Sequence, residues 1–381
     1  MKKKAALFFL SALMITMSCK KPYEPAAITG NNAYLVIDGV INTAANAVTT
    51  IKLSRSRNLG DSVTVSNPEL QAQVVIETDA GGLYNVIQQG NDGTYQTAPL
   101  NLGTAAKYRL KIITHNGSSY ISDFVTAKAS PAIDSITWKQ DKGVKMFVHT
   151  HDPQNKTIYY RWDFAETWLY HSSSQAMLGV NNRRIFYRDS TTQVYNCWGT
   201  ENSTNIITAS TAALSQDVVS YAPLNFLADS TEKLNIRYSI DVKQYALTLE
   251  AYQYWEILKK ATQETGTVFD PQPSQLAGNV KCTTNPNEPV IGFISATSVT
   301  EKRIFIDNSQ LTNWKYTDPA NNICVQVVAL QDPNDYLHYT FFDTSFSPFY
   351  FITPGQLAVL KTYCLDCTRR GGTSIKPSFW Q

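Results

Sequence analysis

The N-terminus of this chain decides which residues can belong to the folded protein. Lysines at positions 2–4 precede an apolar run over residues 5–17, and Ser18 stands directly before Cys19. A charged start, a short apolar core and a small residue at the cleavage point are typical of a secretory signal peptide, and the apolar run is too short to span a bilayer. The sequence therefore predicts that residues 1–18 are removed and that lipid is attached to Cys19.

This lipid would anchor an exported body to a membrane. Each buried CH₂ of an acyl chain contributes about 0.8 kcal/mol, and more than one chain gives a stable anchor. Residues 19–32, which contain Pro22 and Pro25, are expected to form a tether. The formal charge of +2 falls to −1 without the three leader lysines, which gives no electrostatic reason to expect nucleic acid as a partner.

Strand patterns dominate the mature chain and predict a mainly β protein. The segment from Lys107 to Thr114 alternates between apolar and basic residues, and Asn116-Gly117 supplies the turn to the next strand. Short strands at this spacing predict an immunoglobulin-like β-sandwich over residues 33–129. Because 381 residues exceed one typical domain, residues 130–381 are expected to form a second β-rich domain.

One amphipathic helix is expected in this second domain, over residues 247–265. Apolar side chains recur there at helical spacing, Glu250 lies in the first turn and Gly266 closes the helix. This apolar stripe should pack on the sheet of the second domain. Its members are Leu247, Ala251, Trp255 (or Tyr254), Leu258 and Ala261.

The mature chain keeps five cysteines for an oxidising compartment, where structural disulfides persist. At most two bridges can form, and spacing alone does not rank the arrangements. We expect at least one bridge from the C-terminal pair, Cys364 and Cys367, to an upstream cysteine, with Cys282 and Cys324 as the candidates. A redox or zinc role for the close pair is the alternative, although the sequence has neither the βαβ setting nor the second close pair that these roles need.

Several motifs of the mature chain match one known family. The longest runs from Leu247 to Asn279 and includes Phe269-Asp270-Pro271-Gln272-Pro273 after the expected helix. Shorter matches are Tyr160-Arg161-Trp162, Cys197-Trp198, Ile291-Gly292-Phe293 and the ending from Cys364 to Trp380. In these residues the chain resembles the lipoproteins of the Bacteroidota that are grouped as domain of unknown function 4249.

The resemblance implies a location and a partner rather than a reaction. It implies an outer-membrane lipoprotein encoded near receptors of the TonB-dependent transporter type, in a family with no established activity. We therefore expect a noncatalytic accessory that binds a ligand or a protein beside such a transporter. The face of the outer membrane stays open, because Lys20 and Lys21 after the anchor form no acidic surface-export signal.

Two groups of residues have the right chemistry for a site, and each has a simpler explanation. His149 and His151 alternate on one expected strand and can share one metal ion, yet no third ligand is recognisable in the sequence. Glu166 with Arg161 and Asp163 would suit acid/base work, whereas such clusters are commonly ion pairs at the rim of a sheet. We therefore expect no metal and no cofactor.

No motif of a hydrolase, a metalloprotease or a nucleotide-binding protein occurs in the sequence. For this reason we assign no catalytic residue. The alternative function is an envelope hydrolase whose site combines Glu166, Asp270 and His151, and a close cluster of these side chains would support it.

Two segments are candidate partner surfaces. The loop that carries Asp270 and Gln272 is stiffened by two prolines, so it either recognises a partner or connects the helix to the sheet. Phe379 and Trp380 lie at the end of the chain, where exposed aromatic side chains would cost solubility. We expect one of them to dock into the second domain, and the alternative is a free pair that engages a partner.

Overall fold

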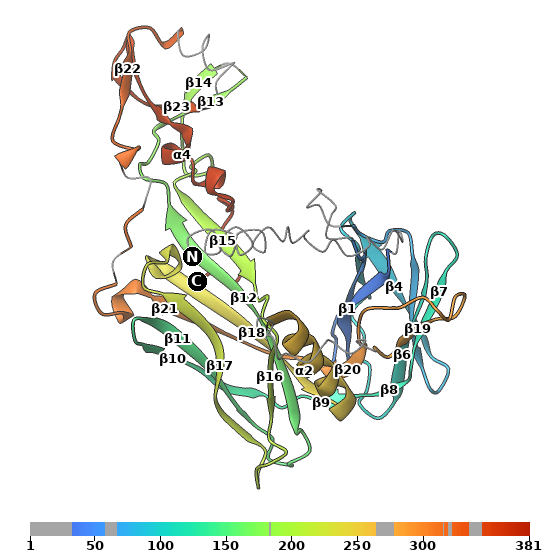
Figure 1. The fold of residues 1–381 in the computed structure, drawn as a ribbon. Coiled ribbons are helices and arrows are strands. Elements are labelled where there is room, and N and C mark those ends of the chain that lie inside the picture. The colour runs from blue at the N-terminus through green and yellow to red at the C-terminus, as the bar shows by residue number, and fades with distance from the viewer. Residues whose placement is uncertain are drawn as a thin grey trace, which may run out of the picture.

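The computed structural model describes residues 33–57, 67–182, 184–263, 278–314, 316–318, 322–334 and 345–381. The expected signal peptide, the lipid site Cys19, the tether and the loop that carries Asp270 and Gln272 lie outside the described residues. The described chain is mainly β, as the sequence predicts, and divides into an N-terminal, a central and a distal module (Figure 1). In this part of the chain no helix has the length and apolar character needed to cross a membrane.

The N-terminal module is a curled sheet of eleven strands. Strand β4 pairs with β3 through its first half and with β5 through its second half, so it joins the two halves of the sheet. The halves face each other across a core that includes Leu35, Ile51, Tyr108 and Tyr120. The strands that precede the central module are β1 Leu35–Asn42, β2 Thr50–Arg55, β3 Gln73–Thr78, β4 Leu83–Gln89, β5 Thr94–Gln96, β6 Lys107–Ile113, β7 Ser119–Ser122, β8 Val125–Thr126 and β9 Lys128–Ala129.

Two strands from much later in the chain complete this sheet. Strand β19 (Val280–Cys282) pairs with β7, and β20 (Ser295–Ser298), drawn in orange beside the blue β1 in Figure 1, pairs in parallel with β1. Val280 and Ile294 are buried in the N-terminal core. The assignment of β19 and β20 to a second domain of residues 130–381 is therefore wrong. The sequence could not show this, because pairing between strands so far apart in the chain leaves no local sequence pattern. An immunoglobulin-like topology stays a prediction.

The central module is a pair of packed sheets. Alternate residues of β12 point inward, so Tyr160 and Trp162 are fully buried between the sheets together with Tyr238 and Met146. The odd-numbered residues of β12 lie on the opposite face, which we call the outer face. One sheet contains β10 Ile133–Gln140, β11 Gly143–His151 and β17 Val218–Ala228, and the other contains β12 Tyr159–His171, β15 Asn196–Asn202, β16 Ile207–Ser210, β18 Arg237–Leu247 and β21 Thr300–Asp307.

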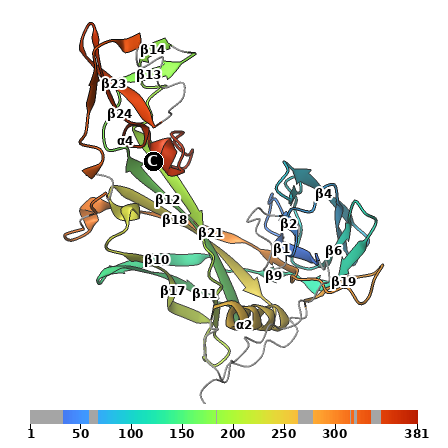
Figure 2. The same ribbon diagram turned by 45° about the horizontal axis from the view of Figure 1, so that its top comes forward.

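The predicted helix is present as α2 (Leu249–Gln263), and it lies between modules rather than on one sheet. It begins later than expected because Leu247 still belongs to β18 and the Thr248 side chain accepts a hydrogen bond from the Ala251 amide, 3.3 Å away. Its buried face contacts β18 and also Val40 and Phe293 of the N-terminal module. Figure 2 shows α2 beside the central strands. The helix therefore fixes the junction of two modules.

The distal module combines two distant segments around a small apolar core. Leu178 of the first segment packs on Leu357 and Val359 of the second. Its strands are β13 Leu178–Asn181, β14 Arg184–Tyr187, β22 Val328–Leu330, β23 Phe346–Thr353 and β24 Gln356–Lys361. The structure also contains the short helices η1 Glu232–Leu234, η2 Asn308–Gln310, α4 Thr362–Leu365 and η4 Cys367–Arg370.

Candidate functional site

The candidate site is a cleft of about 660 Å³ between the N-terminal and central modules. Residues 36–39 of β1 and residues 291–293 form one wall, and the outer face of β12 and β18 forms the other. Helix α2 and the turn at residues 202–206 close its ends. Ligand sites commonly measure about 300–1,000 Å³ and lie between domains, so this cleft has the size and position of a binding site.

The wall from the N-terminal module depends on a close approach of two backbone segments. The Ile37 amide donates a hydrogen bond to the Ile291 carbonyl at 2.8 Å, which holds residues 291–293 against β1. Gly292 has a φ of +140°, and a Cβ atom there would lie 2.3 Å from the Ile37 carbonyl oxygen. Any larger side chain at this position would push the wall apart. Residues 278–298, which add β19 and β20 to the N-terminal sheet, therefore shape the cleft as well as the N-terminal module.

Arg161 forms the charged floor of the cleft. It lies on the outer face of β12 and is only 6% exposed. Its guanidinium carbon lies 4.5 Å from the ring centre of Tyr245 and 4.1 Å from that of Trp255. The Nη2 group donates a 2.8 Å hydrogen bond to Asp163, whereas the buried Nε group has no hydrogen-bond partner. The floor is thus a cation in contact with two aromatic rings.

The two walls differ in polarity. The wall from the N-terminal module is mainly apolar, with half-buried Val36, Ile291 and Phe293, and it also carries the exposed Asp38. The opposite wall carries Asp163, whose side chain is 41% exposed, and Lys243. The cleft is therefore amphipathic across its width.

The tyrosines at the cleft add no charge. Burial raises the pKa of Tyr254 to about 12, and burial also raises the pKa of Tyr245. Both phenols are therefore neutral around pH 7. Among the described residues, the charged side chains that line the cleft are Asp38, Arg161, Asp163 and Lys243.

Glu166 does not belong to this site. Because the side-chain period of a strand is two, Glu166 points to the face of β12 opposite Arg161 and Asp163. Its carboxylate accepts hydrogen bonds at 2.7 Å from both Lys233 and Tyr238. The expected cluster is therefore split: Arg161 pairs with Asp163 on the outer face, Glu166 pairs with Lys233 between the sheets, and the acid/base pair of Glu166 with Asp163 is wrong.

The residues of the hydrolase alternative are not brought together among the described residues. Glu166 contacts Asn225 of β17, and Asn225 lies opposite Met146 of β11. His151 is five residues after Met146 on β11, which corresponds to about 17 Å at about 3.4 Å per residue. His151 pairs with Asp134 at 2.8 Å, and this hydrogen bond raises the pKa of the histidine. Asp270 lies outside the described chain.

The described residues around His149 and His151 do not form a set of metal ligands. His149 Nε2 lies 2.7 Å from the Thr137 hydroxyl, and His151 is occupied by Asp134. In the part of the chain that the structure describes, no group of three or more potential ligands could hold a metal ion. Each histidine therefore has a local structural partner.

Both cysteines of the C-terminal pair are bridged to upstream cysteines. Cys367 is bonded to Cys197, and Cys364 is bonded to Cys324. The expectation of a disulfide at Cys282 is wrong, because this residue is a buried free thiol in the N-terminal core. Spacing could not identify Cys197 instead, since its position beside Cys367 depends on the docking of the distal module.

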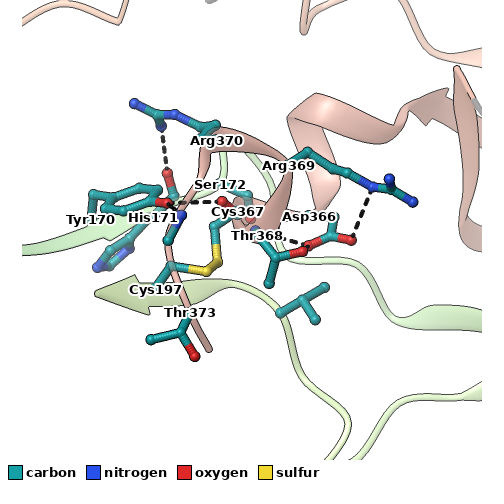
Figure 3. The surroundings of a disulfide bond; sticks show 12 residues. Tyr170, His171, Ser172, Cys197, Asp366, Cys367, Thr368, Arg369, Arg370 and Thr373 are labelled. Carbon is teal, nitrogen blue, oxygen red and sulfur yellow. Dashed lines mark hydrogen bonds and ion pairs between the residues drawn. A yellow bond between two sulfur atoms is a disulfide. The ribbon is translucent and has the colours of Figure 1, made fainter. Parts of the chain in front are cut away.

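Further contacts fasten the C-terminal segment around the Cys197–Cys367 bridge (Figure 3). The Tyr170 hydroxyl donates a hydrogen bond to the Cys367 carbonyl at 2.9 Å, and Arg370 donates one to the His171 carbonyl at 3.1 Å. Arg370 also pairs with Glu232. The bridge thus belongs to a clamp on the end of β12.

The chain end docks, which the sequence predicts. Trp380 is 6% exposed, and its ring centre lies 5.4 Å from Phe305 and 6.2 Å from Trp198. Phe379 stays 37% exposed beneath the guanidinium of Arg303, at 3.7 Å. A role for Trp380 as a free partner surface is therefore wrong.

Removal of residues 377–381 should lower the thermal unfolding midpoint by about 5 °C. A buried tryptophan contributes about 3 kcal/mol or more, and this deletion removes the one that covers Trp198 and Phe305. Differential scanning fluorimetry measures the shift. Ile375→Ala is the control, because this side chain is 77% exposed and should leave the midpoint unchanged. An unchanged midpoint for the deletion would contradict docking.

Fold and cleft together define a modular, mainly β protein with a cleft of ligand size at a module junction. The chain belongs to the family described as domain of unknown function (DUF4249), which matches residues 20–303. No curated protein is similar enough to this chain to count as a relative.

Two solved structures show only a remote likeness. A DUF4785 family protein from Legionella pneumophila is 8% identical, and the match covers 55% of this chain and 51% of that protein with a TM-score of 0.18. The alpha-2-macroglobulin of Escherichia coli, activated by porcine elastase, is 11% identical, with coverages of 56% and 18% and a TM-score of 0.19. The chain thus spans about half of the first protein and less of the second, and TM-scores this low do not indicate a shared fold.

Proposed function

We propose that this protein is a noncatalytic lipoprotein of the cell envelope that holds a ligand in the cleft between its N-terminal and central modules. The observation that carries the proposal is the cleft itself, with an apolar wall, a polar wall and the nearly buried Arg161 at its floor. Pockets of this composition orient a ligand through few polar groups. The separation of Glu166 from His151 favours binding over hydrolysis.

The expected anchor would place this cleft near a membrane. Residues 20–32 lead from Cys19 to β1, and β1 supplies the wall at residues 36–39. A tether of this length spans at most about 50 Å. We further propose, from the family resemblance, that the partner at the outer membrane is a TonB-dependent transporter, to which the cleft presents its ligand.

A neutral dye tests whether the cleft binds. The soluble Cys19→Ala form of the full chain is titrated with N-phenyl-1-naphthylamine, whose fluorescence rises in apolar sites. We expect saturable binding, and we expect Ala165→Trp to abolish it, because Ala165 lines the cleft and a tryptophan there would fill it. Ile375→Ala is the control, because Ile375 is largely exposed and does not line the cleft, and this variant should bind the dye as the parent chain does. Equal binding by Ala165→Trp would overturn the assignment to this cleft.

A pull-down tests the partner. The lipidated protein is crosslinked in cells, purified from outer membranes, and its companions are identified by mass spectrometry. We expect a TonB-dependent transporter to be recovered with the wild-type protein. Recovery of abundant outer-membrane proteins alone, in equal amounts from an unrelated lipoprotein, would contradict this partner.

A further inference from the structure

We propose that the ligand of the cleft is an amphipathic organic anion, with one acidic group held by Arg161 and an apolar body held by the opposite wall. This inference rests on the proposed function and specifies its ligand. It follows from the state of the Arg161 guanidinium, from its fixed position and from the weak competition of the neighbouring carboxylates.

The guanidinium of Arg161 has unused donor capacity. An arginine carries five N–H donors in a planar fork that matches the two oxygens of an acidic group. Arg161 is 6% exposed, its Nη2 donates to Asp163, and its buried Nε has no partner. A buried donor without an acceptor costs free energy. Because Nε itself is closed to solvent, an acidic group that enters the cleft would take the place of Asp163 at Nη2.

The fork is also held in place before any ligand arrives. Tyr245 and Trp255 lie against the guanidinium at 4.5 and 4.1 Å. The backbone of Arg161 pairs with Tyr245 of β18 on one side and Thr208 of β16 on the other. Little rotamer freedom therefore remains to be lost when an anion binds, which favours affinity.

The carboxylates near the cations are weak competitors. The Asp163 side chain is 41% exposed, so water can solvate it when a ligand acid takes its place at Arg161. Lys243 also lines the cleft, and its partner Glu301 lies 3.3 Å away with half of its side chain exposed. Asp38 opposes an anion from the other wall. The anion site is accordingly at the Arg161 end, away from β1.

The apolar wall supplies the second half of the specificity. Val36, Ile291 and Phe293 face the polar floor across the cleft, and Leu258 extends this surface on α2. Burial of an apolar body there contributes about 25 cal/mol per Å². A small inorganic anion would leave this wall wet. The geometry therefore favours an organic acid with a sizeable apolar part.

Two dyes of similar shape and different charge test the inference. The soluble Cys19→Ala chain is titrated with 8-anilinonaphthalene-1-sulfonate, which is anionic, and with neutral N-phenyl-1-naphthylamine. We expect Arg161→Gln to weaken the sulfonate by about tenfold or more, the effect of one charge-assisted hydrogen bond, and to leave the neutral dye unchanged. Asp163→Asn should tighten the sulfonate severalfold, because it removes the competing charge.

Arg303→Gln is the matched control. Arg303 lies on β21, on the same outer face as Arg161. Like Arg161, it contacts an aromatic ring, that of Phe379, and a carboxylate, that of Asp241 at 2.7 Å. Unlike Arg161, it does not line the cleft. This variant should bind both dyes as the parent chain does. The inference is overturned if Arg161→Gln weakens both dyes equally or neither, or if Asp163→Asn leaves the sulfonate unchanged. Failure of both dyes to bind the parent chain would instead overturn the proposed function.

Discussion

Replacement of Cys19 by alanine should move the protein from the membrane fraction into a soluble fraction. The physical reason is that the acyl chains on Cys19 would supply the anchor, at about 0.8 kcal/mol for each buried CH₂. In the described residues no helix offers a second means of spanning the bilayer. Cell fractionation followed by immunoblotting measures the distribution. The effect should be nearly complete, because the proposed anchor depends on this single residue.

Cys282→Ala is the control for this experiment. Cys282 is a buried thiol in the N-terminal core and has no expected role in anchoring. Its variant should remain with the membranes. Membrane recovery of Cys19→Ala equal to that of the parent protein would refute the lipid anchor.

Loss of the Cys197–Cys367 bridge should destabilise the protein more than loss of the Cys324–Cys364 bridge. The chain-entropy account gives about 5 kcal/mol for a separation of 170 residues and about 4 kcal/mol for 40 residues. The longer bridge also ties the distal module to β15, whereas the shorter one closes within the distal module. Urea unfolding of the two double alanine variants measures the difference.

A thiol count provides the control for this prediction. Unfolded, unreduced Cys19→Ala protein should react at one cysteine, Cys282, because the other four are bridged. Cys282→Ala should abolish the reaction. Equal stability of both double variants and the parent chain, or reaction at all five cysteines, would contradict the bridges.

Local periodicity determined much of this protein. Alternation along residues 159–171 already separates an aromatic inner face from an outer face with Arg161 and Asp163, and helical spacing places α2 within two residues of its observed ends. These features follow from the backbone geometry of one element, which repeats every two or 3.6 residues. The same alternation shows that Glu166 and Asp163 cannot share a site.

Tertiary structure decided the rest. The capture of β19 and β20 by the first sheet, the bridge of Cys367 to Cys197 and the wall that Gly292 forms with Ile37 all join residues far apart in sequence. Such pairings depend on the summed packing of whole modules, and no single segment encodes them. The sequence by itself therefore supplied Arg161 and the strand that carries it. The cleft that makes this arginine a binding group exists only because a distant segment returns to β1.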